Sequence, residues 1–170
     1  MKKLMISLLL VGGTLSPAAA EKYAAILKDA KVYEEADPQG FVAQNMKGKD
    51  ITVSTGMVFE VVDEKPGWYV VEYSPGIRGF LVQSFTVPSG ELQKPEAGDY
   101  PLSNNKEVIV NVAFADGAWT LSSNGLNLSG QQKGNVVAFS DKEGNMKYSL
   151  VKFGGKNYIF DYSNDITHFF

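Results

Sequence analysis

Four side chains in this sequence have the chemistry of a shallow binding surface: Tyr33, Phe41, Trp68 and Arg78. Aromatic faces with one or two polar groups bind sugars or peptides, and Trp and Arg are common energetic anchors. We expect these residues on the loops and the outward face of a small β-barrel, and assign them a ligand-binding role. The alternative is structural: Trp68 is buried against a second domain, while Tyr33 and Phe41 close the barrel end.

Residues suited to catalysis or metal binding are few. His168 is the only histidine and lies two residues from the C-terminus. A catalytic histidine needs an orienting partner and a nucleophile within reach, and the sequence has no Gly-x-Ser-x-Gly motif. Terminal disorder or packing beside Phe169 and Phe170 is therefore the favoured interpretation. One histidine and no cysteine cannot supply three or four zinc ligands. We predict no catalytic residue, no metal and no cofactor.

Paired carboxylates keep one enzymatic alternative open. Glycosidases need two carboxyl groups roughly 5–10 Å apart across a cleft. Glu34 and Glu35 are adjacent and point apart in an extended segment, and Asp161 and Asp165 flank a turn. A hydrolase would therefore need carboxylates that converge between two domains. A purely structural or inhibitory protein without a small ligand is the third possibility.

The N-terminus has the pattern of a secretory signal. A basic start, an apolar segment over residues 4–11 and three alanines at 18–20 predict cleavage after Ala20 and export to the periplasm or the cell exterior. Cleavage removes Lys2 and Lys3 from the 16 basic residues, so 14 face 19 acidic ones and the net charge is near −5. Nucleic acid and anionic membranes are poor partners for such a chain, and we expect no membrane insertion after cleavage. Without cysteine, no disulfide holds the exported fold.

The stretch at residues 57–85 must position the candidate residues. β-Branched and aromatic runs predict three strands, separated by turns with Pro and Gly; these strands are 58–62, 68–73 and 79–82. Gly79, before an aromatic residue, predicts a close backbone approach or a bulge. Side-chain alternation puts Trp68 and Glu72 on one face. Because Glu72 is costly to bury unpaired, we place that face outward, which leaves Trp68 at least partly exposed.

This arrangement of strands and turns resembles the bacterial SH3 domain family over about residues 24–87. The resemblance rests on these residues: Gly67-Trp68, Val71, Gly76, Gly79-Phe80 and Val82. Phe80 stands where the family more often has Trp. The resemblance implies an SH3-like barrel that attaches to peptidoglycan or envelope peptides. The family's usual catalytic partners rely on a Cys nucleophile or a His-rich metal site, which this sequence lacks, so a stand-alone binder, adaptor or protein–protein module is favoured.

The second half predicts an antiparallel β-meander, as a half-barrel or a sandwich. Turn signals recur about every 10 residues, and they include dipeptides that two-residue hairpins favour; these are Asp116-Gly117, Asn124-Gly125 and Gly154-Gly155. We divide the chain into a signal peptide (1–20), a barrel (21–88), a linker (89–105) and a meander (106–170). Two points stay open. Residues 21–29 fit a helix or an entry strand, and Tyr100 and Leu102 could begin the second sheet.

The prediction is therefore an all-β exported protein, an N-terminal SH3-like small barrel followed by a C-terminal antiparallel β-meander. We expect non-enzymatic binding of a cell-wall or envelope peptide, a glycan or an envelope protein.

Overall fold

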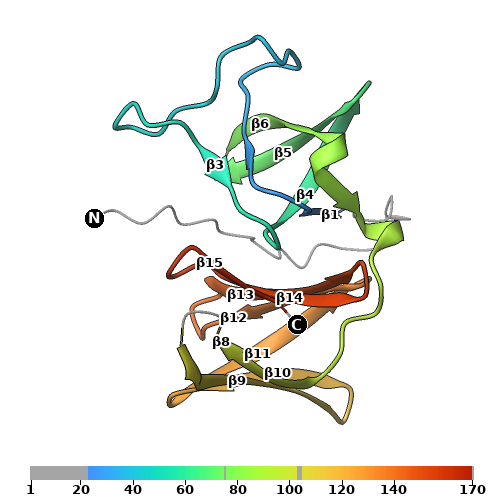
Figure 1. Ribbon diagram of the computed structural model, residues 1–170, viewed down its shortest axis with the longest axis vertical. Coiled ribbons are helices and arrows are strands. Elements are labelled where there is room, and N and C mark those ends of the chain that lie inside the picture. Colours follow the sequence, from blue (N-terminus) through green and yellow to red (C-terminus); the bar gives the residue numbers. More distant parts are fainter. Residues whose placement is uncertain (1–22, 75, 103–104, 170) are drawn as a thin grey trace.

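The computed structural model describes residues 23–74, 76–102 and 105–169, and they form two β modules stacked along the long axis (Figure 1). The helices in these ranges are two three-residue 3-10 turns, η1 (Gln83–Phe85) and η2 (Ser89–Glu91). The all-β prediction is confirmed. The helix alternative for residues 21–29 is wrong over 23–26, which form a strand. The predicted signal peptide at 1–20 lies outside the described residues.

The N-terminal module contains a five-stranded antiparallel sheet in the order β6-β5-β4-β1-β7. Its strands are β1 (Tyr23–Ile26), β4 (Val58–Lys65), β5 (Trp68–Ser74), β6 (Ile77–Val82) and β7 (Thr86–Pro88), accompanied by the pair β2 (Ala30–Lys31) and β3 (Thr52–Val53). All three strands predicted in the central stretch are present. β4 continues to Lys65, so the turn itself is Pro66-Gly67, where Gly67 has a φ of 80°.

The segment that contains Tyr33 extends this sheet beyond β6. The N–H of Tyr33 donates to the carbonyl of Phe80 at 3.0 Å, and the N–H of Phe80 donates back at 2.9 Å. Gly79 permits this approach, because a Cβ there would lie 2.3 Å from Cγ1 of Val32 and 2.9 Å from Cε1 of Tyr73. The close approach predicted at Gly79 is confirmed.

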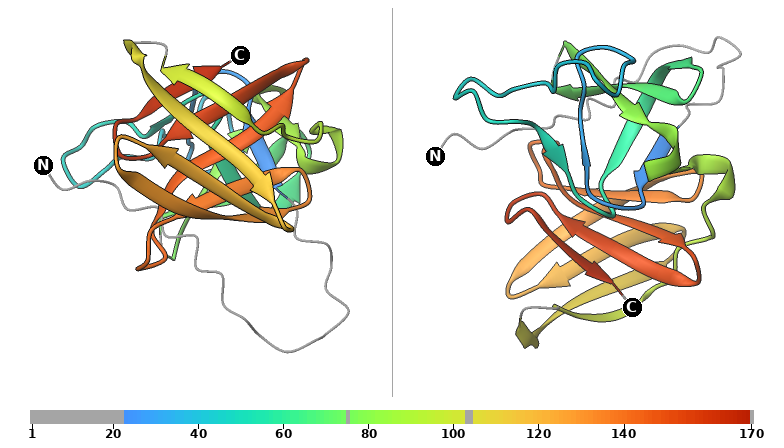
Figure 2. Two further views of the ribbon diagram at one scale, coloured as in Figure 1. Left: turned by 90° about the horizontal axis from the view of Figure 1, so that it is seen from below. Right: turned by 45° about the horizontal axis from the view of Figure 1, so that its top comes forward.

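The C-terminal module is one eight-stranded antiparallel meander in which each strand pairs with the next along the chain. Its strands are β8 (Gly98–Leu102), β9 (Asn105–Ala115), β10 (Ala118–Ser123), β11 (Leu126–Lys133), β12 (Val136–Ser140), β13 (Met146–Phe153), β14 (Lys156–Asp161) and β15 (Ile166–Phe169). β8 and β15 approach each other, so the sheet forms a nearly closed barrel and not a sandwich (Figure 2). Tyr100 and Leu102 belong to this sheet, so the alternative in which they begin the second sheet is confirmed.

The hairpin turns of the meander have the backbone that their residues predicted. Asp116 and Gly117 have φ values of 52° and 79°, and Asn124 and Gly125 have 45° and 80°. Two successive positive φ angles are what a type I′ turn requires. The short-range sequence signals therefore set the strand boundaries here.

The two modules share buried apolar contacts. Phe160 of β14 is buried in the core cluster of the N-terminal module, beside residues such as Phe59. A second cluster joins Tyr23 and Val58 of the N-terminal sheet to Val151 and Phe153 of β13. Shared apolar cores of this kind hold modules as one unit.

Candidate functional site

A groove follows the N-terminal module to the boundary between the modules. It comprises two adjoining hollows, of about 360 and 510 Å³, that share Asp29 and Ser54. We name the first the aromatic hollow, because Tyr33 and Phe85 line it together with residues of β2 and β3. We name the second the interdomain hollow, because β14 and β15 contribute to its lining. Both volumes fall in the range of about 300–1,000 Å³ common for ligand pockets.

Backbone pairing and ring packing position the aromatic hollow. Tyr33 is fixed by its bridges to Phe80 and Val42. Its ring packs edge-to-face with that of Trp68, with the ring centroids 5.4 Å apart and the planes at 80°. Phe85 follows β6 in η1, and Nζ of Lys28 lies 3.8 Å from its ring centroid. An ammonium at that distance makes a cation–π contact. Aromatic rings therefore form one wall of the groove.

An ion pair stands at the rim of the aromatic hollow. Nζ of Lys31 donates to Oδ2 of Asp50 at 3.0 Å, and Nε2 of Gln44 donates to Oδ1 at 3.4 Å. The hydrogen bond from Lys31 lowers the pKa of Asp50, and the same bond raises the pKa of Lys31. Both groups are solvent-exposed, so the pair adds little to stability. It joins the end of the long loop at residues 34–50 to β2.

The interdomain hollow is lined by carboxylates, hydroxyls and one ammonium group, together with Tyr158 and Ile166. Oδ1 of Asp29 accepts from the N–H of Thr55 at 2.9 Å and from its hydroxyl at 3.2 Å, which fixes the turn before β4. Asp165 approaches from the turn before β15 with a φ of 57°. The carboxylate of Asp165 makes no hydrogen bond or ion pair with any residue that the structure describes.

The C-terminal module fixes the floor of this groove through the turn at residues 54–57. The hydroxyl of Ser149 donates to the carbonyl of Gly56 at 3.3 Å, and the N–H of Val58 donates to Oη of Tyr162 at 3.2 Å. Thr167 also donates its hydroxyl to the carbonyl of Thr55. Burial raises the pKa of Tyr162, so its hydroxyl stays protonated. The position of Thr55 in the groove thus depends on β13–β15.

The expectation that Trp68 is exposed is wrong. Glu72 is exposed as expected, but Trp68 on the same face is only 8% exposed. The reason is tertiary: Tyr33 returns beside β6 and its ring packs against the indole. Trp68 therefore packs beneath Tyr33 and supports the aromatic wall. Tyr33, which covers the indole, belongs to the same module as Trp68.

The other predicted residues lie apart from one another. Tyr33 is half-buried and lines the groove. Phe41 is 78% exposed on the loop at 34–50. Arg78 is exposed on β6, opposite Glu72 of β5. The structure thus brings together Tyr33 and Trp68, and neither Phe41 nor Arg78 lines either hollow.

Two other polar residues considered for catalysis, His168 and Asp161, do not line either hollow. His168 is 1% exposed in β15, so it is packed and does not belong to a disordered tail. Burial lowers its pKa. Asp161, 3% exposed, accepts from the N–H groups of Ser163 and Asn164 at 2.7 and 3.1 Å, so it caps a turn. Within the described ranges, no group of three or more His, Asp or Glu could hold a metal ion.

Three residues that line the hollows carry only weak signals in the sequence. Asp29 belongs to no recognisable motif, and Phe85 is a single aromatic residue between Ser84 and Thr86. Asp165 was recognised only as one side of a turn. Folding of the N-terminal module brings Asp29 and Phe85 to one hollow, and docking of the two modules brings Asp29 and Asp165 to the other; no local pattern contains either link.

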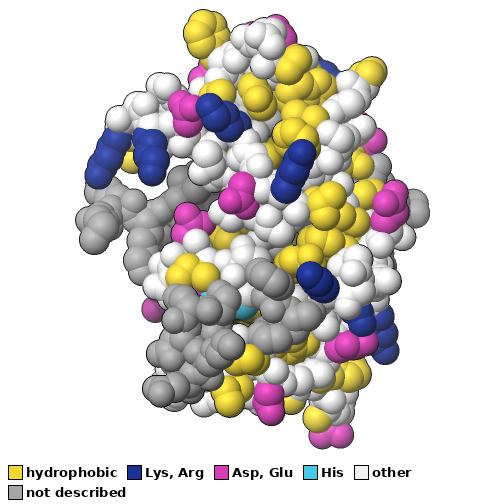
Figure 3. All heavy atoms as spheres, in the orientation of Figure 1, with side chains coloured by type: hydrophobic (Ala, Val, Ile, Leu, Met, Phe, Trp, Pro, Cys, Tyr) yellow, Lys and Arg dark blue, Asp and Glu magenta, His cyan; other side chains and the backbone are white. Residues whose placement is uncertain are grey.

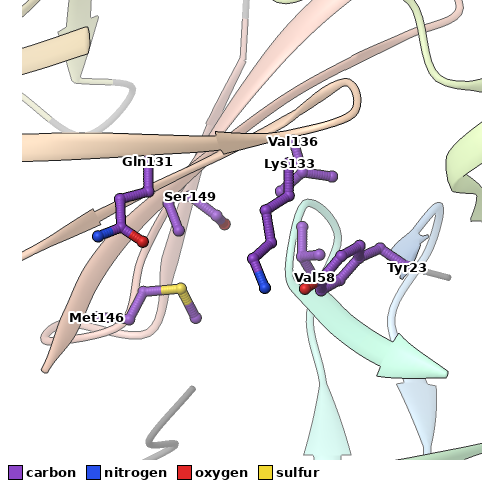
Figure 4. Close-up of a pocket in the computed structure, with 8 residues that line it drawn as sticks. Tyr23, Val58, Gln131, Lys133, Val136, Met146 and Ser149 are labelled. Carbon is purple, nitrogen blue, oxygen red and sulfur yellow. The ribbon is translucent and has the colours of Figure 1, made fainter. Parts of the chain in front are cut away.

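A further space between the modules is too small for a ligand. Tyr23 and Val58 face Lys133, Met146 and Ser149 across it (Figure 4). Its volume of about 20 Å³ is close to that needed for one water molecule. It is part of the apolar contact and no candidate site.

Comparisons of the chain with protein-family models, curated proteins and solved structures find no match. Among residues 23–74, 76–102 and 105–169, no helix is long and apolar enough to cross a membrane. Acidic and basic side chains are interspersed over the face in Figure 3, with no large patch of one sign.

Proposed function

We propose that this chain is an exported, non-enzymatic binding protein of the cell envelope, in which an SH3-like barrel and a β-meander together hold a wall peptide or glycan. The observation that carries the proposal is the groove, whose aromatic hollow continues into the interdomain hollow, where charged groups lie beside Tyr158 and Ile166. Tyr33 and Phe85 offer ring surface at one end, and Asp29 lies where the two hollows meet. An elongated ligand with apolar and polar parts fits such a surface.

Several features of the N-terminal module support the SH3-like part of the proposal. Five short antiparallel strands combine with a long loop at 34–50, as in the resemblance described above. Gly79 and Phe80 mediate the approach of β6 to Tyr33. The predicted signal peptide supports export, and the net negative charge favours a partner that is not nucleic acid.

The test is retention of the mature protein on isolated cell wall and on envelope extract. Thr52→Arg places a bulky side chain at an exposed position of the aromatic hollow and should abolish retention. Thr120→Arg makes the same change at an exposed strand position of β10, far from the groove in sequence and module, and should retain wild-type binding. Phe41→Ser should also leave retention unchanged, because Phe41 lies outside both hollows. Failure of the wild-type protein to bind either material would refute the proposal.

A carboxylate-based hydrolase is the second candidate, and one observation favours it. Asp29 and Asp165 both line the interdomain hollow, and glycosidases use two carboxyl groups across a cleft. Asp29, however, already accepts two hydrogen bonds from Thr55. Release of reducing sugar ends from cell wall by the wild-type protein, lost in Asp165→Asn, would establish this candidate in place of the binder.

A further inference from the structure

The interdomain hollow gathers two carboxylates where the aromatic hollow has one, and Tyr158 and Ile166 add apolar surface to it. Asp29 and Asp165 bring carboxylates, Ser54 brings a hydroxyl, and Lys156 brings an ammonium group. From this chemistry we propose that the interdomain hollow binds one saccharide unit of the ligand. The proposal deepens the proposed function and rests on it, since it names the part of the ligand that this end of the groove takes.

The assignment of a saccharide rests on the hydrogen-bonding capacity of the side chains that line the hollow. Oδ1 of Asp29 is committed to Thr55, but Oδ2 takes no part in those bonds. The carboxylate of Asp165 has no partner among the described residues, although its turn places it at the hollow. Carboxylates are acceptors only. Each sugar hydroxyl is a donor and an acceptor, so it can donate to these oxygens and accept from the hydroxyl of Ser54.

Other ligand classes fit this hollow less well. An anionic group would meet two carboxylates, which repel it. A divalent metal would need more acidic ligands than the described residues gather in one place. An apolar group would leave the carboxylates without hydrogen-bond partners at a desolvation cost. A neutral or amino saccharide avoids all three penalties.

Both modules contribute to the proposed site. The N-terminal module supplies Asp29 and Ser54, and the C-terminal module supplies Lys156 and Asp165. The bond between Ser149 and the Gly56 carbonyl holds the two halves in register. The meander therefore completes a binding site, which is a role that its regular fold alone does not reveal.

The experiment titrates the mature full chain with two soluble probes, a tetrasaccharide of N-acetylglucosamine and a tetrasaccharide of glucose, followed by ¹H–¹⁵N NMR. Shifts should concentrate in residues 54–55 and 165–167 for at least one probe. Asp165→Asn should weaken that binding about tenfold or more, because a hydrogen bond to a charged group is lost. Asp116→Asn is the matched control, since Asp116 is also exposed at a positive φ of 52° in a hairpin turn.

The outcomes separate this inference from the proposed function. If neither tetrasaccharide shifts these residues, or if Asp165→Asn and Asp116→Asn bind alike, the saccharide assignment is overturned. Continued retention of Asp165→Asn on cell wall in that case would leave the aromatic hollow as the binding surface. If the wild-type chain is not retained on cell wall or envelope extract, the proposed function itself is overturned.

Discussion

The two modules differ in how far apart along the chain their paired strands lie. In the C-terminal meander every hydrogen-bonded neighbour is the next strand along the chain, whereas β1 of the N-terminal sheet pairs with both β4 and β7. The N-terminal sheet is then extended by the isolated pairing of Tyr33 with Phe80. Local pairing therefore organises one module, and contacts between distant segments organise the other.

The groove lies where the contacts are least local. Tyr33 reaches the aromatic hollow through its pairing with β6, and Asp165 reaches the interdomain hollow only because the modules dock. The difference teaches that the meander acts as a regular scaffold, against which the irregular module is held. Each of the following changes asks whether the two modules remain one thermodynamic unit.

The two tryptophans give the largest expected effect, and each lies in a different module. Trp68→Ala removes an indole that is 8% exposed and packed on Tyr33, and Trp119→Ala removes one that is 4% exposed beside Phe114. Large-to-small changes of this kind cost about 3–5 kcal/mol. Urea unfolding followed by circular dichroism should show both variants with a lower midpoint.

Each variant retains the other tryptophan as a fluorescence reporter for the opposite module. Because the modules share buried clusters, fluorescence and circular dichroism should give the same midpoint within each variant. Separate midpoints for the two probes would show that the modules unfold independently. A Trp68→Ala protein of wild-type stability would restore the surface role first expected for Trp68.

Gly56→Ala attacks the docking turn itself. Gly56 has a φ of 89°, and an added Cβ would lie 3.2 Å from Cγ2 of Thr167 and 3.3 Å from Cβ of Tyr158. Backbone strain and overpacking together should cost about 2–4 kcal/mol. The measurement is the free energy of unfolding from urea titration.

Gly125→Ala is the matched control for this change. Gly125 has a φ of 80°, but a Cβ there would meet no atom within 4 Å. Only the strain remains, about 1 kcal/mol. The difference in unfolding free energy between the two variants measures the crowding at the docked turn. Equal losses would mean that Thr167 and Tyr158 move aside without cost.

The contrast between the modules also decides what could be predicted from the sequence. Asp116-Gly117 and Asn124-Gly125 specify hairpin turns locally, and both turns form at these residues with two successive positive φ angles. Gly79 predicted a close approach without identifying Val32 and Tyr73 as its neighbours. A single sequence shows that a small residue is needed, but not which segment comes near it.

The candidate site was predictable only where it depended on residue type. Tyr33 does line the groove, while the ligand-binding role assigned to it from its residue type stays a prediction. Trp68 was misplaced, because alternation along β5 gives its face and not the segment that returns to cover that face. Asp29 and Asp165 come together across 136 positions of sequence through module docking alone.

The smallest expected effect is a pH dependence of the free energy of unfolding, caused by His168 in β15 of the meander. Burial lowers the pKa of His168, and the nearby carboxylate of Asp161 opposes that shift. The unfolded chain, with a histidine pKa of about 6.5, therefore takes up the proton first on acidification. Stability should be full above about pH 6.5, fall as the pH drops through that value, and level off below the folded pKa.

His168 is the only histidine in the chain, so the slope of stability between about pH 7.5 and 5.5 isolates it. The lowered pKa values of Asp50, Glu96 and Asp141 act only at more acidic pH, where protonation of these carboxylates removes stability. His168→Gln should flatten the slope in urea titrations across this window. If the slope persists in that variant, the burial of one imidazole in β15 is not its cause. If both fluorescence reporters follow the same slope, acid weakens the N-terminal module through a residue that lies only in the meander, which requires the two modules to be coupled.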